Sequence, residues 1–316
     1  MKRVLLFGMI AVAVAVAGGY VIFRQHFSWK PTEPSSLGQP GRLQVVASFY
    51  PLYFLSERIA GGRADVKNIV PAGAEPHDYE PTAQDMALLE KSGLVVLNGG
   101  GLEAWEGDLR KNIGGNARII VAGEGLTNRE MTGEEGGQLT TDPHIWVDPA
   151  LAKKMTENIE RGFELADPEN AAYYRKNTDQ LLEDLSRIDD AYRIRLESCT
   201  EKNIITSHAA FGYLAAEYGF NQVPIAGLSP DAEPSPAKLA DIAKFARENN
   251  VRYIFFESLA SPKLSQTIAS EIGAETLVLN PIEGLSPDEE SEGKDYLSIL
   301  SENLKNLQMA LQCNTR

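Results

Sequence analysis

Short apolar runs that alternate with helix-like segments restrict the fold of this sequence more than any other feature. Leu43–Tyr50, Ala64–Val70 and Leu94–Leu97 have the composition of buried strands. A helix opens at Pro51, between the first two of these runs. Parallel strands need a long crossover connection, usually a helix. The alternation therefore predicts an α/β fold whose mostly parallel sheets are flanked by helices.

The alternation continues through most of the chain. Further strands are predicted at 117–121, 203–207, 251–256 and 276–279. Helices are predicted at 82–91, from 208 to 218, and at 236–250, 262–272 and 296–312. One segment interrupts the pattern. Glu124–Thr141 is rich in glycine and acidic residues, and it predicts a mobile surface loop.

One helix is predicted to be much longer than the others. Asp167, Pro168 and Glu169 form a strong helix start, and apolar residues then recur at helical spacing to the vicinity of Cys199. About 30 residues at 1.5 Å each make a rod of roughly 45 Å. Such a rod is long enough to join two α/β lobes.

The N-terminus has the pattern of an export segment. Lys2 and Arg3 precede Val4–Phe23, which carries no charge. About 20 apolar residues also suffice to cross a bilayer. We therefore expect residues 1–30 to be a signal peptide or a retained membrane anchor, followed by a Pro- and Ser-rich linker at 31–42. No cysteine lies near the end of the run, which excludes a lipid-modified N-terminal cysteine as the tether.

The net charge argues against one class of partner. The formal charge is −14 and the pI is about 4.9. Nucleic-acid binding depends on lysine and arginine contacts to phosphates. We therefore expect no nucleic-acid partner.

The chain has two cysteines, Cys199 and Cys313. In an exported protein they can form a disulfide. Their positions, before a predicted strand and after the last predicted helix, make pairing geometrically reasonable. Two free, buried thiols are the alternative.

Four potential metal ligands occupy comparable places in the predicted fold. The chain has four histidines, of which His26 lies at the boundary of the apolar segment. His77, His144, His208 and Glu283 lie in loops or directly after predicted strands. In open α/β sheets, ligands bind beyond the carboxyl ends of the strands. These four side chains can therefore converge on one cleft.

The residue types favour zinc. Imidazole nitrogen suits Zn²⁺, and a carboxylate can complete a tetrahedron. Mn²⁺ would favour more oxygen ligands and is the less favoured ion, while residue type alone leaves iron and nickel open. The sequence contains no HExxH or CxxC motif, so the spacing by itself is a weak signal.

Several polar residues near these histidines can support them, because a liganding histidine usually donates its other N–H to a carboxylate or carbonyl. The candidates are Asp78, Asp142, Asp148, Ser207, Asp231 and Glu257. Glu257 follows a predicted buried strand and is also the replacement ligand should Glu283 not bind. Trp146 is expected to form an apolar wall beside the site.

Five segments give the chain a family resemblance. They are EPHDYEPTAQD, DPHIWVDP, TSHAAFGYLA, GLSPDAEPSP and NPIEGLS, in that order. With them, residues 43–316 resemble the zinc- and manganese-binding group of solute-binding proteins of ABC transporters. The resemblance implies two α/β lobes joined by one long, rigid helix, with the metal held between the lobes.

The resemblance also implies a ligand set and domain boundaries. The ligands would be His77, His144, His208 and Glu283. At the third position the chain resembles the zinc members in having a histidine, whereas manganese members tend to carry glutamate there. The metal-binding lobes would span 43–166 and 199–316, with the connecting helix at 167–198. Many zinc members carry a His-rich loop where this chain has Glu124–Thr141, which contains no histidine.

The implied function is that of an extracytoplasmic carrier. It would capture Zn²⁺ outside the cytoplasmic membrane, in the periplasm or anchored to the outer face of that membrane, and deliver it to an importer. The partners would be the permease and the ATPase of the transporter, and the carrier would act as a monomer without enzymatic activity. The alternatives are a manganese carrier, a surface adhesin, and a zinc hydrolase in which Glu283 acts as general base.

Overall fold

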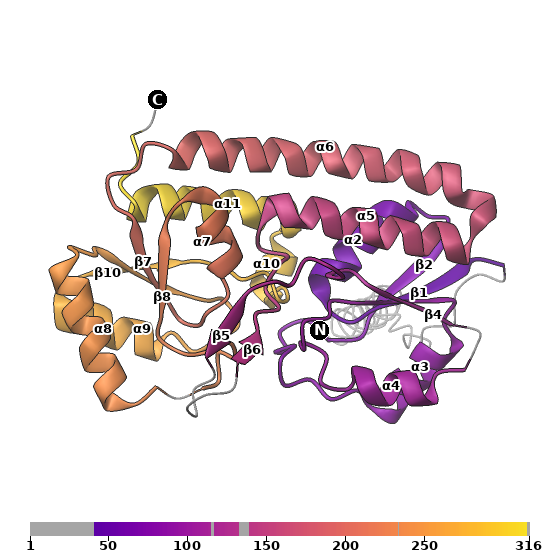
Figure 1. The fold of residues 1–316 in the computed structure, drawn as a ribbon, viewed down its shortest axis with the longest axis horizontal. Coiled ribbons are helices and arrows are strands. Elements are labelled where there is room, and N and C mark those ends of the chain that lie inside the picture. Colours follow the sequence, from indigo (N-terminus) through magenta and orange to yellow (C-terminus); the bar gives the residue numbers. More distant parts are fainter. Residues whose placement is uncertain (1–40, 115–116, 133–138, 233, 315–316) are drawn as a thin grey trace, which may run out of the picture. The chain divides into compact units, whose positions relative to one another are not determined.

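The computed structural model describes residues 41–114, 117–132, 139–232 and 234–314 (Figure 1). The expected export segment and nearly all of the expected linker lie outside these residues. Among the helices of the described ranges, none combines the length and the apolar character that crossing a bilayer requires.

The first sheet is parallel and has the strand order β2-β1-β3-β4. Its strands are β1 (Leu43–Ala47), β2 (Ala64–Asn68), β3 (Leu94–Leu97) and β4 (Arg118–Val121). Successive residues of a strand point to opposite faces. Val46 and Val95 accordingly pack with α3 (Ala83–Lys91) and α4 (Glu106–Asn112). Val45 and Val96 face the side of α2 (Tyr50–Ala60) and α5 (Pro149–Ala166).

The second sheet is also parallel, with the order β10-β9-β7-β8. Its strands are β7 (Asn203–Thr206), β8 (Asn221–Pro224), β9 (Tyr253–Phe256) and β10 (Glu275–Val278). Ile205 and Ile254 pack with α8 (Pro236–Glu248) and α9 (Lys263–Ile272). The opposite face joins the core that contains α7 (Gly212–Tyr218) and α11 (Tyr296–Ala310). The short helix α10 (Pro287–Ser291) precedes α11.

The long helix α6 (Ala171–Leu196) contacts helices beside both sheets: α2 and α5 at the first, α7 and α11 at the second (Figure 1). It has 26 residues, and its length is therefore roughly 39 Å. Tyr174, Leu181, Leu185 and Tyr192 are fully buried and lie on one face at helical spacing. The predicted α/β fold class, with parallel sheets, flanking helices and a long helix, is confirmed.

The predicted start of that helix is wrong by four residues. A separate 3₁₀ turn occupies Pro168–Asn170, and the α-helix begins at Ala171. The carboxylate of Asp167 does not cap the helix, because it accepts a hydrogen bond of 2.6 Å from the hydroxyl of Tyr174. The helix also ends at Leu196, three residues before the expected end at Cys199.

The segment expected to be an irregular loop contains a hairpin. Strands β5 (Glu130–Thr132) and β6 (Leu139–Thr141) pair antiparallel, so the loop prediction is wrong for these residues. Residues 133–138, between the two strands, lie outside the described part of the chain. The hairpin brings Arg129 and Asp142 together, since the amide of Asp142 donates to the carbonyl of Arg129 at 2.9 Å.

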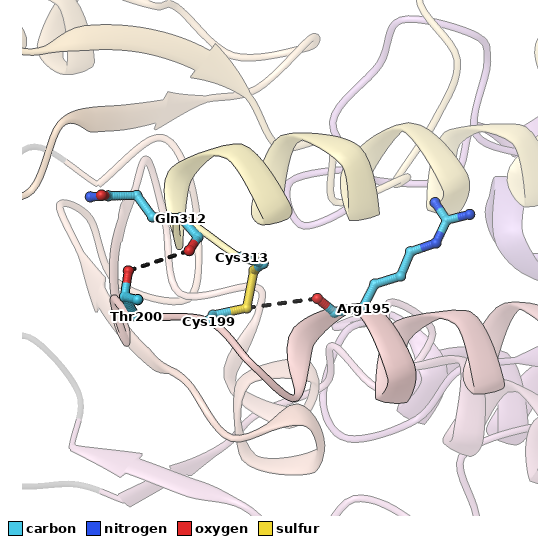
Figure 2. Close-up of a disulfide and its surroundings, with 5 residues drawn as sticks. All are labelled: Arg195, Cys199, Thr200, Gln312 and Cys313. Atoms are coloured by element: carbon cyan, nitrogen blue, oxygen red, sulfur yellow. Dashed lines mark hydrogen bonds between the residues drawn. A yellow bond between two sulfur atoms is a disulfide. The ribbon is translucent and has the colours of Figure 1, made fainter. Parts of the chain in front are cut away.

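Cys199 and Cys313 are joined in a disulfide between the segments that follow α6 and α11 (Figure 2). The surrounding backbone supports this junction, since the amide of Glu201 donates to the carbonyl of Leu311 at 3.0 Å. The hydroxyl of Thr200 also donates to the carbonyl of Gln312 at 3.3 Å (Figure 2). The ends of the two helices are thus held side by side.

Candidate metal centre

The four candidate ligands come from four loops and meet at one place. His77 lies in the loop after β2, and His144 lies between β6 and α5. His208 follows β7, and Glu283 lies beyond β10. One ligand atom from each of the four lies within 4.8 Å of each of the others. His144 and His208 are fully buried, Glu283 is 1% exposed, and the side chain of His77 is 10% exposed.

Five of the six distances among the four ligand atoms have the spacing of a tetrahedral metal site. Nε2 of His144 lies 3.1 Å from Nε2 of His77 and 3.3 Å from Nε2 of His208. Oε1 of Glu283 lies 3.4, 3.5 and 3.3 Å from Nε2 of His77, His144 and His208, respectively. A tetrahedral zinc ion with bonds of about 2.0–2.1 Å has ligands about 3.3–3.4 Å apart. The five distances match that edge length.

The chemistry of the ligand atoms also fits a cation. Oε1 of Glu283 is buried and has no hydrogen-bond partner among the described residues. Burying such a group without compensation is costly. The four atoms that face one another are all electron-pair donors when the imidazoles are neutral at Nε2. A divalent cation at their centre would satisfy all four.

His144 is held by Asp142, two residues before it. Oδ1 of Asp142 accepts from the backbone amide of His144 at 3.0 Å and from its ring Nδ1 at 2.8 Å. The bond at Nδ1 fixes the tautomer and directs Nε2 toward the other ligands. Asp142 is thus placed to support His144 as a ligand.

His208 has an equivalent support in Glu257, which follows β9. Nδ1 of His208 lies 2.8 Å from both carboxylate oxygens of Glu257, and the amide of His208 donates to Oε1 at 3.1 Å. Because strands β7 and β9 are neighbours in the sheet, the residues after them meet at its edge. Glu257 contacts Nδ1 of His208, whereas Oε1 of Glu283 lies on the side of Nε2, 3.3 Å away.

The site combines strong burial with strong charge interactions. Burial alone would lower the pKa of His208, but Glu257 and Glu283 outweigh it and hold that pKa well above the ordinary value. Burial would raise the pKa of Glu283, but the three histidines, His208 foremost, hold it well below the usual range. The pKa of His144 is raised, because Asp142 and Glu283 outweigh its burial. At His77 burial prevails over the effect of Glu283, and the pKa is lowered.

Trp146 packs beside the candidate ligands. Its fully buried side chain lies against the imidazole of His144, with ring centres 5.1 Å apart. Its Nε1 donates to the carbonyl of Pro281 at 2.7 Å, in the turn that leads to Glu283. The indole therefore connects two of the ligand loops.

Four other predicted supporting residues make no hydrogen bond to a ligand side chain in the described structure: Ser207, Asp148, Asp78 and Asp231. The hydroxyl of Ser207 contacts the carbonyl of Phe255 and the hydroxyl of Ser265, at 3.4 and 3.3 Å. Asp148 caps α5 by accepting from the amide of Ala150. The predicted role of Asp231 is wrong in this respect: it lies at the surface beside the exposed Asp78, whose pKa is raised by burial and then by Asp231.

Glu75 is a further acidic residue at the site that was not predicted. Its Oε1 accepts from the backbone amide of His77 at 3.2 Å. Burial, followed by the charge of Glu283, raises the pKa of Glu75 to about 8. Its position two residues before a candidate histidine, like that of Asp142, is the signal that could have identified it.

Comparison with known proteins agrees with this geometry. The family described as "Zinc-uptake complex component A periplasmic" matches residues 45–310. The "High-affinity zinc uptake system protein ZnuA" of Bacillus subtilis is 41% identical over 290 residues, which are 89% of this chain and 91% of that protein. A "Zinc-binding protein AdcA" of Streptococcus pyogenes is 33% identical over 302 residues, which are 90% of this chain but only 59% of that longer protein.

A solved structure covers the matching part of such a longer protein. The Zn(II)-bound ZnuA-like domain of Streptococcus pneumoniae AdcA is 37% identical to this chain and superposes with a TM-score of 0.74. The match covers 86% of this chain and 99% of that domain. The family match spans most of the sequence, and the ligand loops, the second sheet and nearly all of the first sheet lie within it. The chain therefore belongs to the ZnuA family of periplasmic zinc-uptake components.

Proposed function

We propose that this protein captures Zn²⁺ outside the cytoplasmic membrane and delivers it to an ABC-type importer. The ion would be bound by Nε2 of His77, His144 and His208 and by Oε1 of Glu283. The observation that carries the proposal is the set of five ligand distances between 3.1 and 3.5 Å. They correspond to tetrahedral coordination at zinc bond lengths.

The donor set favours zinc over manganese. Three imidazole nitrogens and one carboxylate suit Zn²⁺, whereas Mn²⁺ prefers oxygen ligands. His208 supports this choice, because its Nδ1 is engaged by Glu257 and only its nitrogen Nε2 faces the centre. A glutamate at the same position would offer oxygen instead.

The same geometry favours binding and transport over catalysis. Catalytic zinc usually keeps one coordination position for water or substrate, while four protein ligands close the shell. Oε1 of Glu283 lies within 3.5 Å of Nε2 of all three histidines, where it would complete the tetrahedron. There it would be a ligand and not a general base, so we infer that the protein is not an enzyme.

The transporter partners and the cellular location belong to the same proposal. A carrier of this kind needs a permease and an ATPase to move the ion across the membrane. We infer that the carrier acts as a monomer in the periplasm or at the outer face of the cytoplasmic membrane. The uncharged run Val4–Phe23 would direct its export.

The test is zinc binding by the purified protein, offered zinc and manganese together. We expect one zinc ion per chain by elemental analysis. His144→Ala should weaken zinc binding by at least about tenfold in a competition titration with a chelator, the minimum expected from loss of a supporting residue. Ser207→Ala should leave the zinc affinity unchanged. Ser207 precedes a ligand in the sequence, but its hydroxyl contacts Phe255 and Ser265 instead of a ligand.

Two results would contradict the proposal. One is stoichiometric manganese in place of zinc, and the other is unchanged zinc affinity in His144→Ala. Delivery requires a separate measurement, the uptake of radioactive zinc by cells that lack their own copy of this protein. The wild-type chain should restore uptake, and His144→Ala should not.

A further inference from the structure

The turn that carries Glu283 has an unusual backbone. Ile282, the residue before it, has a φ of 62°, in the left-handed region. A branched β-carbon makes this region unfavourable, so an isoleucine there is a conformational outlier. The side chain of Ile282 is fully buried. Such conformations persist only where the surrounding structure enforces them.

Two asparagines, Asn280 and Asn303, form hydrogen bonds that hold the backbone at Ile282. The amide of Ile282 donates to Oδ1 of Asn280 at 2.7 Å. Asn303, on α11, bonds twice to Asn280: its Oδ1 accepts from the amide of Asn280 at 2.9 Å, and its Nδ2 donates to the carbonyl at 2.7 Å. Both asparagines are 2% exposed. The C-terminal helix thus holds the turn through paired, buried hydrogen bonds.

Further contacts hold the same turn from other directions. Nδ2 of Asn280 donates to Oγ of Ser258 at 2.9 Å and to Oε1 of Glu289 at 2.7 Å. The carbonyl of Pro281 accepts from the indole of Trp146. The backbone amide, the backbone carbonyl and both polar side-chain atoms of Asn280 therefore all form hydrogen bonds that hold this segment.

Packing alone does not fix the position of Glu283. A cavity of about 480 Å³ borders Glu283, Gly284 and Leu285, with Tyr50 and Tyr53 among its other lining residues. Space beside the loop leaves room for it to move. Among the bonds that the described residues make at this turn, only that from the amide of Ile282 to Asn280 acts directly on the residue with the strained backbone.

We propose that Asn280 and Asn303 are positioning residues that hold Glu283 in place as the fourth zinc ligand. This inference rests on the proposed function. Without the asparagine pair the turn would relax, the carboxylate would leave the tetrahedron, and a three-histidine site of lower affinity would remain. The pair thereby makes α11 a determinant of zinc affinity, although α11 contributes no ligand.

The experiment compares two asparagines of the same helix. Asn303→Ala removes the bonds to Asn280, while Asn306→Ala removes an equivalent bond, from Nδ2 of Asn306 to the carbonyl of Val278 at 2.8 Å. Zinc affinity is measured by competition titration with a chelator in the full chain. We expect Asn303→Ala to weaken binding by about tenfold or more, as for other residues that orient ligands. Asn306→Ala should leave affinity within about twofold of wild type, although both variants lose a hydrogen bond of the same kind.

A double-mutant comparison separates positioning from a general structural role. In a Glu283→Ala background, Asn303→Ala should cause little further loss, because the ligand atom that it positions is already absent. An equal loss in both backgrounds would overturn the inference. If Asn303→Ala does not fold, Asn280→Ala, which leaves α11 intact, serves for the same comparison.

The result also distinguishes this inference from the proposed function. If His144→Ala binds zinc as tightly as wild type, the site itself is wrong. If His144→Ala loses affinity while Asn303→Ala and Asn280→Ala keep it, only the positioning role is wrong.

Discussion

The backbone amide of Gly73 donates a hydrogen bond of 3.1 Å to the carbonyl of Leu285. Gly73 lies four residues before His77, and Leu285 lies two residues after Glu283. The bond therefore ties together two ligand loops that belong to different sheets. It limits how far His77 and Glu283 can move apart, and mutation of Gly73 can test its contribution.

We expect Gly73→Ala to weaken zinc binding, with Gly62→Ala as the matched control. Both glycines are exposed, with φ values of 79° and 87°, and an added Cβ would meet nothing within 4 Å at either position. Each variant should therefore lose about 1–2 kcal/mol of stability from backbone strain. Only Gly73→Ala should also lower zinc affinity, by about three- to tenfold, the effect of weakening one hydrogen bond. Equal affinities in the two variants would show that the bond does not support the site.

Asp142→Asn should weaken zinc binding by about 10–100-fold, because a neutral amide orients the imidazole of His144 less strongly than a carboxylate. Asp231→Asn makes the same chemical change at the surface and should have no effect. Chelator competition measures both affinities, and circular dichroism checks that both variants fold. Identical affinities would mean that His144 does not need its carboxylate partner.

Asp148 should make the metal-free protein less stable as the pH rises. Burial, followed by the charges of Glu217 and Asp189, raises the pKa of Asp148 to about 6. The unfolded pKa is about 3.9, so the neutral form favours folding. This contribution is fully present below about pH 4 and is lost as the pH passes through 6, and its size is on the order of 2–3 kcal/mol.

Asp148→Asn removes that dependence and keeps a residue that can cap α5. The variant should gain stability relative to wild type between pH 4 and 7, as measured by urea denaturation of the metal-free protein. Asp295→Asn, which alters the capping residue of α11 in the same way, controls for the loss of a capping carboxylate. Parallel stability profiles of wild type and Asp148→Asn would rule out the effect.

Replacing both Cys199 and Cys313 by serine should destabilise the protein without changing zinc affinity. The disulfide links residues 114 positions apart. Closing a loop of that length restricts the unfolded chain by about 4–5 kcal/mol in the entropic treatment. Denaturation of the oxidised wild type and the double variant measures the difference. Titration of free thiols should give none in the wild type before reduction and two after it, and two thiols without reductant would contradict the pairing.

The sheets were largely predictable from the sequence because their strands are short and apolar. All four residues of β3, Leu94–Leu97, are buried, as expected for a strand covered on both faces. The rule that ligands gather beyond the carboxyl ends of strands also directed attention to His208 and Glu283. Regular structure and local rules thus account for the correct part of the prediction.

Helix α5 was not predicted, although the sequence contains its signals. Asp148 and Pro149 form a cap and a first helical residue, and Ala152, Met155, Ile159 and Phe163 recur at helical spacing. The start predicted at Asp167 was wrong for a different reason. The hydroxyl of Tyr174 engages that carboxylate, and a contact of this kind is decided by three-dimensional packing.

The turn at Glu283 could not be predicted in the same way. Its shape depends on Asn303, which is 23 positions from Asn280 in sequence, and on a φ that isoleucine seldom adopts. No local pattern encodes such a pairing. The carboxylates that support His144 and His208 also differ in sequence distance. Asp142 is two residues from His144, whereas Glu257 is 49 residues from His208.

Both sheets follow the same strand order: second, first, third and fourth along each half of the chain. The two halves of the chain therefore share one topology. The loops of the first half carry His77 and His144, and those of the second carry His208 and Glu283. Neither half alone carries more than two of the four candidate ligands, so both halves are needed to surround an ion. In the present chain α6 contacts helices of both halves, and the two halves are parts of one polypeptide.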